Sequence, residues 1–219
     1  MMLIGMFDSP FVRRVAVSMK LLGLPFEHCN WSVGKDFDRI AKFNPVGRVP
    51  TLVLDDGEAL IESAAILDYL DERAGDERAG PQRTLLPRSG SERRRALHVM
   101  ALASGAAEKG VAQVYEYVLR PEEKRYEPWL ERCRKQMHGA LAELERICRE
   151  RGLGKWLVAD RLTQADITVT CVFTYLTDAL ALTPERAPYP AIRALAARCE
   201  ALPEFQATRL AFVAPIPAK

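Results

Sequence analysis

The sequence contains no CxxC pair, no internal repeat and no apolar run of the roughly 20 residues that a membrane-spanning helix needs. The first apolar run, residues 1–7, is interrupted by Asp8 and has no basic residues ahead of it. It therefore fails both requirements of a secretory signal. The five cysteines are odd in number and widely spaced. This pattern favours reduced thiols in a cytoplasmic protein over a disulfide scaffold or a zinc site, so we expect no metal.

The sequence also has little net charge, since 31 basic residues nearly balance 29 acidic ones to give +2. We therefore expect neither nucleic acid nor an anionic membrane as a partner. Apolar residues make up 48% and charged residues 27% of the chain, which is the composition of a globular protein with a proper core. A length of 219 residues suits one domain or two small ones.

The first third of the chain alternates strand-like and helical patterns. The expected strands are residues 3–7, 26–31, 51–54 and 59–61, and the expected helices are residues 10–22, 39–42 and 63–73. Asp55-Asp56-Gly57 separates the last two strands and is a strong hairpin signal. The order β-α-β-α-β-β-α predicts a thioredoxin-like domain over residues 1–76.

Glycine and proline recur between Gly75 and Ser91 without a sustained apolar period, which predicts a linker over residues 77–91. Residues 92–219 then carry long helical patterns and predict an all-α helical bundle domain. One expected helix places six apolar residues on a single face, namely Leu130, Cys133, Met137, Leu141, Leu144 and Cys148. Thr163 and Asp166 have the spacing of a capping box, which predicts a helix running to about Leu180. Further helices are expected over residues 191–202 and from Pro203.

The first segment that could carry chemistry begins at Ser9-Pro10. Proline at a first helical position leaves Ser9 as the N-cap. A helix N-terminus attracts anions, and a serine hydroxyl there can donate a hydrogen bond to a thiolate. The alternative is that Ser9 only caps the helix.

The second segment surrounds Val49-Pro50, directly before a strand. A cis bond there would accommodate the missing N–H of Pro50 and expose the main chain of Val49 to an extended peptide, although trans X-Pro bonds are commoner. In the third segment, Glu62-Ser63, a helix follows a strand immediately and offers a second N-terminus for a carboxylate. Ser63 would cap this helix or bind the ligand. Glu62 suits an amino group, or is an acid in a first helical turn.

These segments together resemble the cytosolic glutathione transferase superfamily, in serine-dependent lineages similar to the tau and zeta classes. The resemblance covers almost the whole chain. It rests on four motifs in the family's order: Ser-Pro-Phe-x-x-Arg-Val, Val-Pro-Thr-Leu, Glu-Ser and Thr-x-x-Asp. It implies a thioredoxin-like domain followed by an all-helical domain, glutathione as co-substrate, and a homodimer.

The resemblance also implies roles for individual residues. Ser9 matches the serine that hydrogen-bonds the glutathione sulfur, and Val49 with cis-Pro50 matches the site that pairs with the main chain of the tripeptide's cysteine. Glu62 and Ser63 match the site of the γ-glutamyl end. Lys42 and Arg48 match basic positions near the glycyl carboxylate. Phe7 and Phe11 flank Ser9 and either line an apolar second-substrate site, to which Phe11 is assigned, or belong to ordinary interdomain packing.

The function that this resemblance implies is conjugation of the glutathione thiolate to small hydrophobic electrophiles, a detoxification reaction. A second interpretation keeps the glutathione site for isomerisation, dehalogenation or ether cleavage. A third is a binding protein without turnover, similar to the stringent starvation proteins that contact RNA polymerase.

Other residues are weaker candidates. Four residues lie on the long helix that in the family borders the electrophile pocket, and they either line that pocket or belong to ordinary packing: Met100, Ala103, Tyr115 and Tyr117. Gly105 and Gly110 would loosen or bend this helix. The histidines and the run Arg93-Arg94-Arg95 are expected to be structural or solvated.

Overall fold

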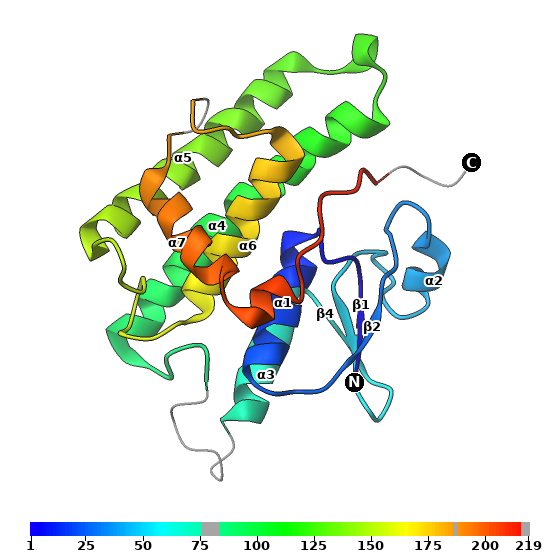
Figure 1. Ribbon diagram of the computed structural model, residues 1–219. Coiled ribbons are helices and arrows are strands. Elements are labelled where there is room, and N and C mark those ends of the chain that lie inside the picture. The colour runs from blue at the N-terminus through cyan, green and yellow to red at the C-terminus, as the bar shows by residue number, and fades with distance from the viewer. Residues whose placement is uncertain (76–83, 186–187, 216–219) are drawn as a thin grey trace. The chain divides into compact units, whose positions relative to one another are not determined.

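The computed structural model describes residues 1–75, 84–185 and 188–215. The chain divides into two compact units. The first unit comprises Met1–Leu86 together with Pro203–Lys219, and the second comprises Pro87–Leu202. Each unit is built around its own set of secondary-structure elements (Figure 1).

The first unit contains a four-stranded mixed sheet in the order β2-β1-β3-β4. Its elements are β1 (Met2–Ile4), α1 (Pro10–Leu21), β2 (Glu27–Cys29), α2 (Phe37–Ala41), β3 (Thr51–Val53), β4 (Ala59–Ile61), α3 (Ser63–Ala74) and, after the second unit, α8 (Pro203–Gln206). Strand β1 runs parallel to β2 and antiparallel to β3, which is itself antiparallel to β4. This is the thioredoxin-like arrangement that the sequence predicts, with strands one to three residues shorter than most of their apolar patterns.

Helices α1 and α3 lie side by side on one face of the sheet, and α2 lies on the other face (Figure 1). On the α2 side, Ile40 packs with Ile4 and Val53 in a buried apolar cluster. On the α1 side, α1 presents Val12, Val15 and Met19, none of which is exposed to solvent. Successive strand residues point to opposite faces, so three-residue strands are enough to join both layers.

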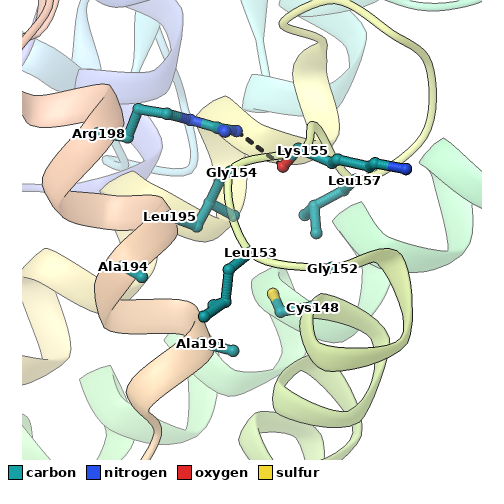
Figure 2. A pocket seen from close by; sticks show the side chains of 10 residues that line it. All are labelled: Cys148, Gly152, Leu153, Gly154, Lys155, Leu157, Ala191, Ala194, Leu195 and Arg198. Atoms are coloured by element: carbon teal, nitrogen blue, oxygen red, sulfur yellow. Dashed lines mark hydrogen bonds between the residues drawn. The ribbon is translucent and has the colours of Figure 1, made fainter.

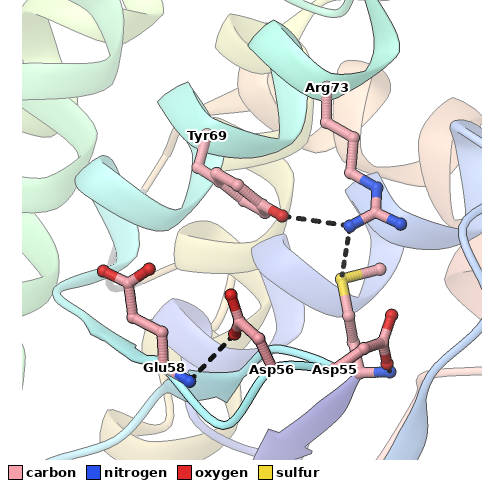
Figure 3. Close-up of polar contacts among 6 residues, drawn as sticks. Asp55, Asp56, Glu58, Tyr69 and Arg73 are labelled. Atoms are coloured by element: carbon pink, nitrogen blue, oxygen red, sulfur yellow. Dashed lines mark hydrogen bonds and ion pairs between the residues drawn. The ribbon is translucent and has the colours of Figure 1, made fainter.

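The β3–β4 connection is the hairpin that the sequence predicts. The Asp56 carboxylate accepts the Glu58 N–H at 3.0 Å and closes the turn (Figure 3). Beside it on α3, Arg73 donates to the Tyr69 hydroxyl at 3.0 Å. These polar contacts occupy the rim of the sheet rather than its core.

The second unit is helical throughout its described elements. They are α4 (Gly90–Leu119), the 3-10 turn η1 (Glu122–Lys124), α5 (Glu127–Arg151), α6 (Gln164–Leu180) and α7 (Pro190–Glu200). Helix α4 packs against α5 and α6, and α7 packs against α5 and α6. Within the described ranges, none of the helices is both long and apolar enough to span a membrane.

The apolar face predicted for α5 is buried from Leu130 to Cys148. Helix α4 is continuous through both of its internal glycines. A Cβ at Gly110 would lie 2.2 Å from Cδ2 of Leu176 on α6, whereas a Cβ at Gly105 would meet nothing within 4 Å. Gly110 therefore permits close packing of α4 on α6.

The capping box predicted at the start of α6 is present. The Asp166 carboxylate accepts both the N–H and the hydroxyl of Thr163 at 2.9 Å, and it accepts the N–H of Leu157 at 2.8 Å. Asp166 is fully buried. It thus ties the loop before α6 to the helix itself.

The C-terminal segment differs from expectation, because residues 203–219 group with the first unit instead of the helical domain of 92–219. The reason is Arg13, which is buried in α1 and donates to the carbonyl oxygens of Phe205 and Thr208. Much of the expected linker of 77–91 lies outside the described residues. Its last part is not a free linker, since the N–H groups of Leu85 and Leu86 donate to the Asp71 carboxylate of α3.

Candidate functional site

Ser9 caps helix α1, as its sequence context predicts. Its main chain is extended (φ −68, ψ 125), and its Oγ accepts the N–H of Val12 at 3.4 Å. No hydrogen bond donated by the Ser9 hydroxyl is present among the described residues, and the side chain is half-buried. The hydroxyl proton is therefore available to a ligand at the N-terminus of α1.

Asp8 precedes Ser9 and was not singled out from the sequence. Burial raises the pKa of the Asp8 carboxyl above its ordinary value, while the N–H groups of Val213 and Ser9 act in the opposite direction. Its Oδ2 accepts the N–H of Val213 at 2.9 Å. No local motif could reveal this contact, because its partners are 205 positions apart.

The Val49-Pro50 bond is cis, which settles the alternative that the sequence leaves open. Gly5 has φ +129, and a Cβ there would lie 2.5 Å from Val12 Cγ2 and 2.8 Å from Val49 Cβ. Only glycine fits this crossing. The close approach brings Val49 next to the first turn of α1, so two of the three motif segments meet.

Asn44 organises the loop that carries the two predicted cations. It is buried, donates to the Arg48 carbonyl at 2.8 Å and accepts the N–H of Val46 at 3.0 Å. The side chains of Lys42 and Arg48 are exposed on either side of it. The sequence placed Asn44 in the motif but assigned it no role; its structural role is to shape this loop.

At the start of α3 the N-cap is Glu62 and not Ser63. Glu62 has φ 69, and its carboxylate accepts the Ala64 N–H at 3.4 Å. The Ser63 hydroxyl accepts from the buried guanidinium of Arg14 at 2.6 Å and lies 3.2 Å from the Glu62 carboxylate. Because Arg14 occupies an acceptor position of Ser63 Oγ, the hydroxyl proton is directed to Glu62 or to a ligand.

Arg14 connects α1 with the start of α3; it is the arginine of the Ser-Pro-Phe-x-x-Arg-Val motif, to which the sequence assigned no role. It belongs to α1, five positions after Ser9, and its guanidinium lies 5.8 Å from the ring of Phe11. Phe11 is half-buried.

Phe7 stacks on His28 with 3.7 Å between ring centroids, and His28 Nε2 lies 2.7 Å from the Gly5 carbonyl oxygen. His28 thus has the structural role expected for it.

The candidates on α4 are divided by burial: Met100 and Ala103 are buried, and Tyr115 and Tyr117 are exposed. Tyr117 accepts from Arg134 at 2.8 Å. The described residues contain no cluster of His, Cys, Asp and Glu side chains able to hold a metal ion.

The helical unit has a small cavity of its own between the end of α5, the following loop and α7 (Figure 2). It is lined by Cys148, Gly152, Leu153, Gly154, Lys155, Leu157, Ala191, Ala194, Leu195 and Arg198. Arg198 donates to the Lys155 carbonyl at 2.8 Å and stacks 3.8 Å from the Trp156 ring centroid. None of the predicted glutathione ligands lines this cavity.

Both parts of the chain match family models of known proteins. Residues 3–78 match the family model described as glutathione S-transferase, N-terminal domain, and residues 127–198 match the one described as glutathione S-transferase, C-terminal domain. The uncharacterized GST-like protein YibF of Escherichia coli (strain K12) is 31% identical over 80% of this chain and 82% of its own.

Two solved structures are similar over nearly their whole length. A glutathione S-transferase of Methylobacterium radiotolerans, in complex with glutathione sulfonate, has a TM-score of 0.84 at 30% identity and covers 100% of this chain and 95% of its own. One of Methylobacillus flagellatus, with glutathione bound, has a TM-score of 0.84 at 26% identity and covers 99% of each chain. The chain therefore belongs to the cytosolic glutathione transferase superfamily and has the glutathione transferase fold.

Proposed function

We propose that this protein is a glutathione transferase in which Ser9 stabilises the thiolate of bound glutathione. The observation that carries the proposal is the Ser9 hydroxyl at the N-terminus of α1, whose proton has no acceptor among the described residues. The bound glutathione of the solved relatives supports glutathione as the ligand here.

The other residues of the first unit then hold the tripeptide. The main chain of Val49 pairs with its cysteine as an added strand beside Pro50. Glu62 receives its ammonium group and Ser63 its γ-glutamyl carboxylate at the N-terminus of α3. Lys42 and Arg48, whose cationic side chains are exposed, attract the glycyl carboxylate.

The chemical task is to produce a thiolate near neutral pH. A free thiol has a pKa near ~8.5, and lowering it by ~2 units requires about 2.7 kcal/mol of preferential thiolate stabilisation. A charge-assisted hydrogen bond from Ser9 supplies about 1.5–3 kcal/mol, and the dipole of α1 adds up to about 1 kcal/mol. The hydrogen bond therefore supplies much of the required stabilisation, and the dipole adds to it.

The thiolate sulfur then attacks the electrophilic carbon of an acceptor, and the leaving group departs with the bonding electron pair. Phe11 offers an apolar surface near Ser9, which suits small hydrophobic electrophiles and a detoxifying role. We propose a cytoplasmic homodimer; the free state of all five cysteines supports a reducing compartment, and the dimer rests on family resemblance.

Replacement of Ser9 tests the proposal. We expect Ser9→Ala to bind glutathione with an affinity close to that of the parent protein, while the pKa of the bound thiol rises and conjugation slows by roughly 10- to 100-fold. Ser9→Thr keeps both a hydroxyl and a helix cap, and serves as the control. Calorimetric titration gives the affinity, and thiolate ultraviolet absorbance against pH gives the thiol pKa.

Other results would favour a different role for Ser9 or a different function for the protein. Full conjugating activity in Ser9→Ala would reduce Ser9 to a helix cap. Glutathione binding by the parent protein without a lowered thiol pKa would point to a disabled or differently used site. Absence of glutathione binding would favour a binding protein without turnover.

A further inference from the structure

The cavity between α5 and α7 belongs wholly to the helical unit. It lies between the end of α5, the loop of residues 152–157 and α7, and is called the α5–α7 cavity below (Figure 2). Its volume is about 40 Å³. Since one water molecule needs roughly 10–15 Å³, the cavity has room for about three waters or a chain of about three carbon atoms. It therefore suits the apolar part of a small molecule.

The loop leaves this space open because its own leucine does not fill it. Leu153 lies between Gly152 (φ +94) and Gly154 (φ +80), two positions whose backbone conformation favours glycine. This turn leaves the Leu153 side chain 75% exposed, although the residue lines the cavity. The mouth of the cavity thus offers apolar surface that a ligand could cover.

The inner wall of the cavity is apolar. Leu157, Ala191 and Leu195 line it, and each is less than a tenth exposed. Cys148 contributes a thiol that is neutral near pH 7, because burial raises its pKa to about 12. The wall therefore favours an alkyl group and supplies no nucleophile.

The charge at the cavity is positive. The described residues that line it include Arg198 and Lys155 and no acid. Arg198 stacks 3.8 Å from the Trp156 ring centroid and donates from Nη2 to the Lys155 carbonyl at 2.8 Å, which fixes its guanidinium beside the loop (Figure 2). That carbonyl is the one acceptor that the described part of the chain gives to its five N–H groups, and the buried Nε has none. Because a buried charged donor without an acceptor is unfavourable, the guanidinium favours an anion.

We propose that the α5–α7 cavity binds a short aliphatic carboxylate. Its alkyl chain of about three carbon atoms packs against Leu157 and Leu195, and its carboxylate accepts hydrogen bonds from Arg198. Lys155 is exposed on the loop and attracts the anion. The inference is independent of the proposed function, because none of the predicted glutathione ligands lines this cavity.

NMR titration of the full chain, labelled with ¹⁵N, tests the site with the amides of Gly152 and Gly154 as reporters and the ionic strength held constant. We expect butyrate to bind roughly tenfold more tightly than acetate, because two more carbon atoms are buried. Hexanoate should gain less than about twofold over butyrate, since a chain of about three carbons fills the cavity. Butylamine, a cation with a similar chain, should not bind. The site would be overturned if butyrate gave no saturable shift of the reporters, or if acetate and butyrate bound equally.

Two exposed alanines of α7 make a matched pair of variants. Ala194 lines the cavity and Ala197 does not. Ala194→Leu fills the space with its own side chain, so we expect it to lower the affinity for butyrate at least about tenfold, whereas Ala197→Leu should change it less than about twofold. Equal affinities of the two variants would show that butyrate binds elsewhere.

The contribution of Arg198 is tested with butyramide, which has the chain of butyrate without its charge. Arg198→Gln should lower the affinity for butyrate at least about tenfold and that for butyramide less than about twofold. An equal loss for both ligands would contradict the assignment of the carboxylate to Arg198. Failure of the parent protein to bind glutathione would count against the proposed function alone, since butyrate should still shift the reporters.

Discussion

At the scale of single residues, burial controls the chemistry of the cysteines. It is the largest cause of the raised thiol pKa values of Cys29 and Cys133, and it raises those of Cys148 and Cys199 to about 12. A raised pKa reduces the fraction of reactive thiolate at neutral pH. The only nucleophilic sulfur that we expect at the active site is therefore that of glutathione.

This predicts slow labelling of the protein's own thiols. Near pH 8 we expect Cys148 and Cys199 to react with Ellman's reagent on the order of a thousandfold more slowly than free cysteine, from their thiolate fraction alone. All five thiols should react once the protein is unfolded in guanidinium. Cys148→Ala identifies the contribution of the thiol that lines the cavity of Figure 2; rapid labelling of native Cys148 would contradict the expectation.

Residue types and spacing predicted much of the candidate site because its motifs are local. Ser9-Pro10 encodes a helix start within two positions. The missed residues act through partners far along the chain: Arg14 reaches Ser63, 49 positions away, and Asp8 reaches Val213, 205 positions away. Such contacts follow from tertiary packing. The motif that contains Arg14 does not reveal its partner Ser63, and nothing in the sequence around Asp8 points to Val213.

At the scale of elements, periodicity and capping signals were sufficient for most boundaries. The α5 face and the Thr163 capping box depend on residues three or four positions apart, so their patterns determine them locally. The effect of Gly110 depends instead on Leu176 of α6, which the pattern of α4 does not contain. Gly110 was therefore expected to loosen or bend α4, whereas it allows α4 to pack closely against α6.

The two glycines of α4 make a matched pair of test sites. We expect Gly105→Ala to raise the free energy of unfolding by about 0.5–1 kcal/mol, because alanine favours the helix and its Cβ meets nothing within 4 Å. Gly110→Ala should lower it by about 1–3 kcal/mol, because Leu176 is fully buried and must move away from the new methyl group. Urea unfolding followed by circular dichroism measures both. Stabilisation by Gly110→Ala would mean that Leu176 can rearrange at no cost.

At the scale of the whole molecule, the first unit is discontinuous in sequence. It takes residues 203–215 from beyond the helical unit, which itself is one uninterrupted stretch. The domain boundaries drawn from composition missed this exchange because the returning segment is short and its anchors are main-chain carbonyl groups, which have no signature in the sequence.

Two truncations test how much the returning segment contributes. A chain ending at Leu202 removes both carbonyl acceptors of the buried Arg13, so we expect a loss of roughly 3 kcal/mol or more and a clearly lower melting temperature. A chain ending at Arg209 keeps both acceptors and should melt within a few degrees of the full chain. Scanning calorimetry compares the two variants; equal melting temperatures would show that the Arg13 anchor adds no stability.

The discontinuity also sets an order of events during biosynthesis. The ribosome delivers Phe205 and Thr208 only after it has made the whole of Pro87–Leu202. The helical unit can therefore fold first. The thioredoxin-like unit is translated earlier, but until the end of synthesis it lacks Phe205 and the two carbonyl groups to which Arg13 donates. Until residues 203–208 have been synthesised, the unit that carries Ser9 is incompletely folded, and it is the unit that a chaperone would bind or a protease would cleave.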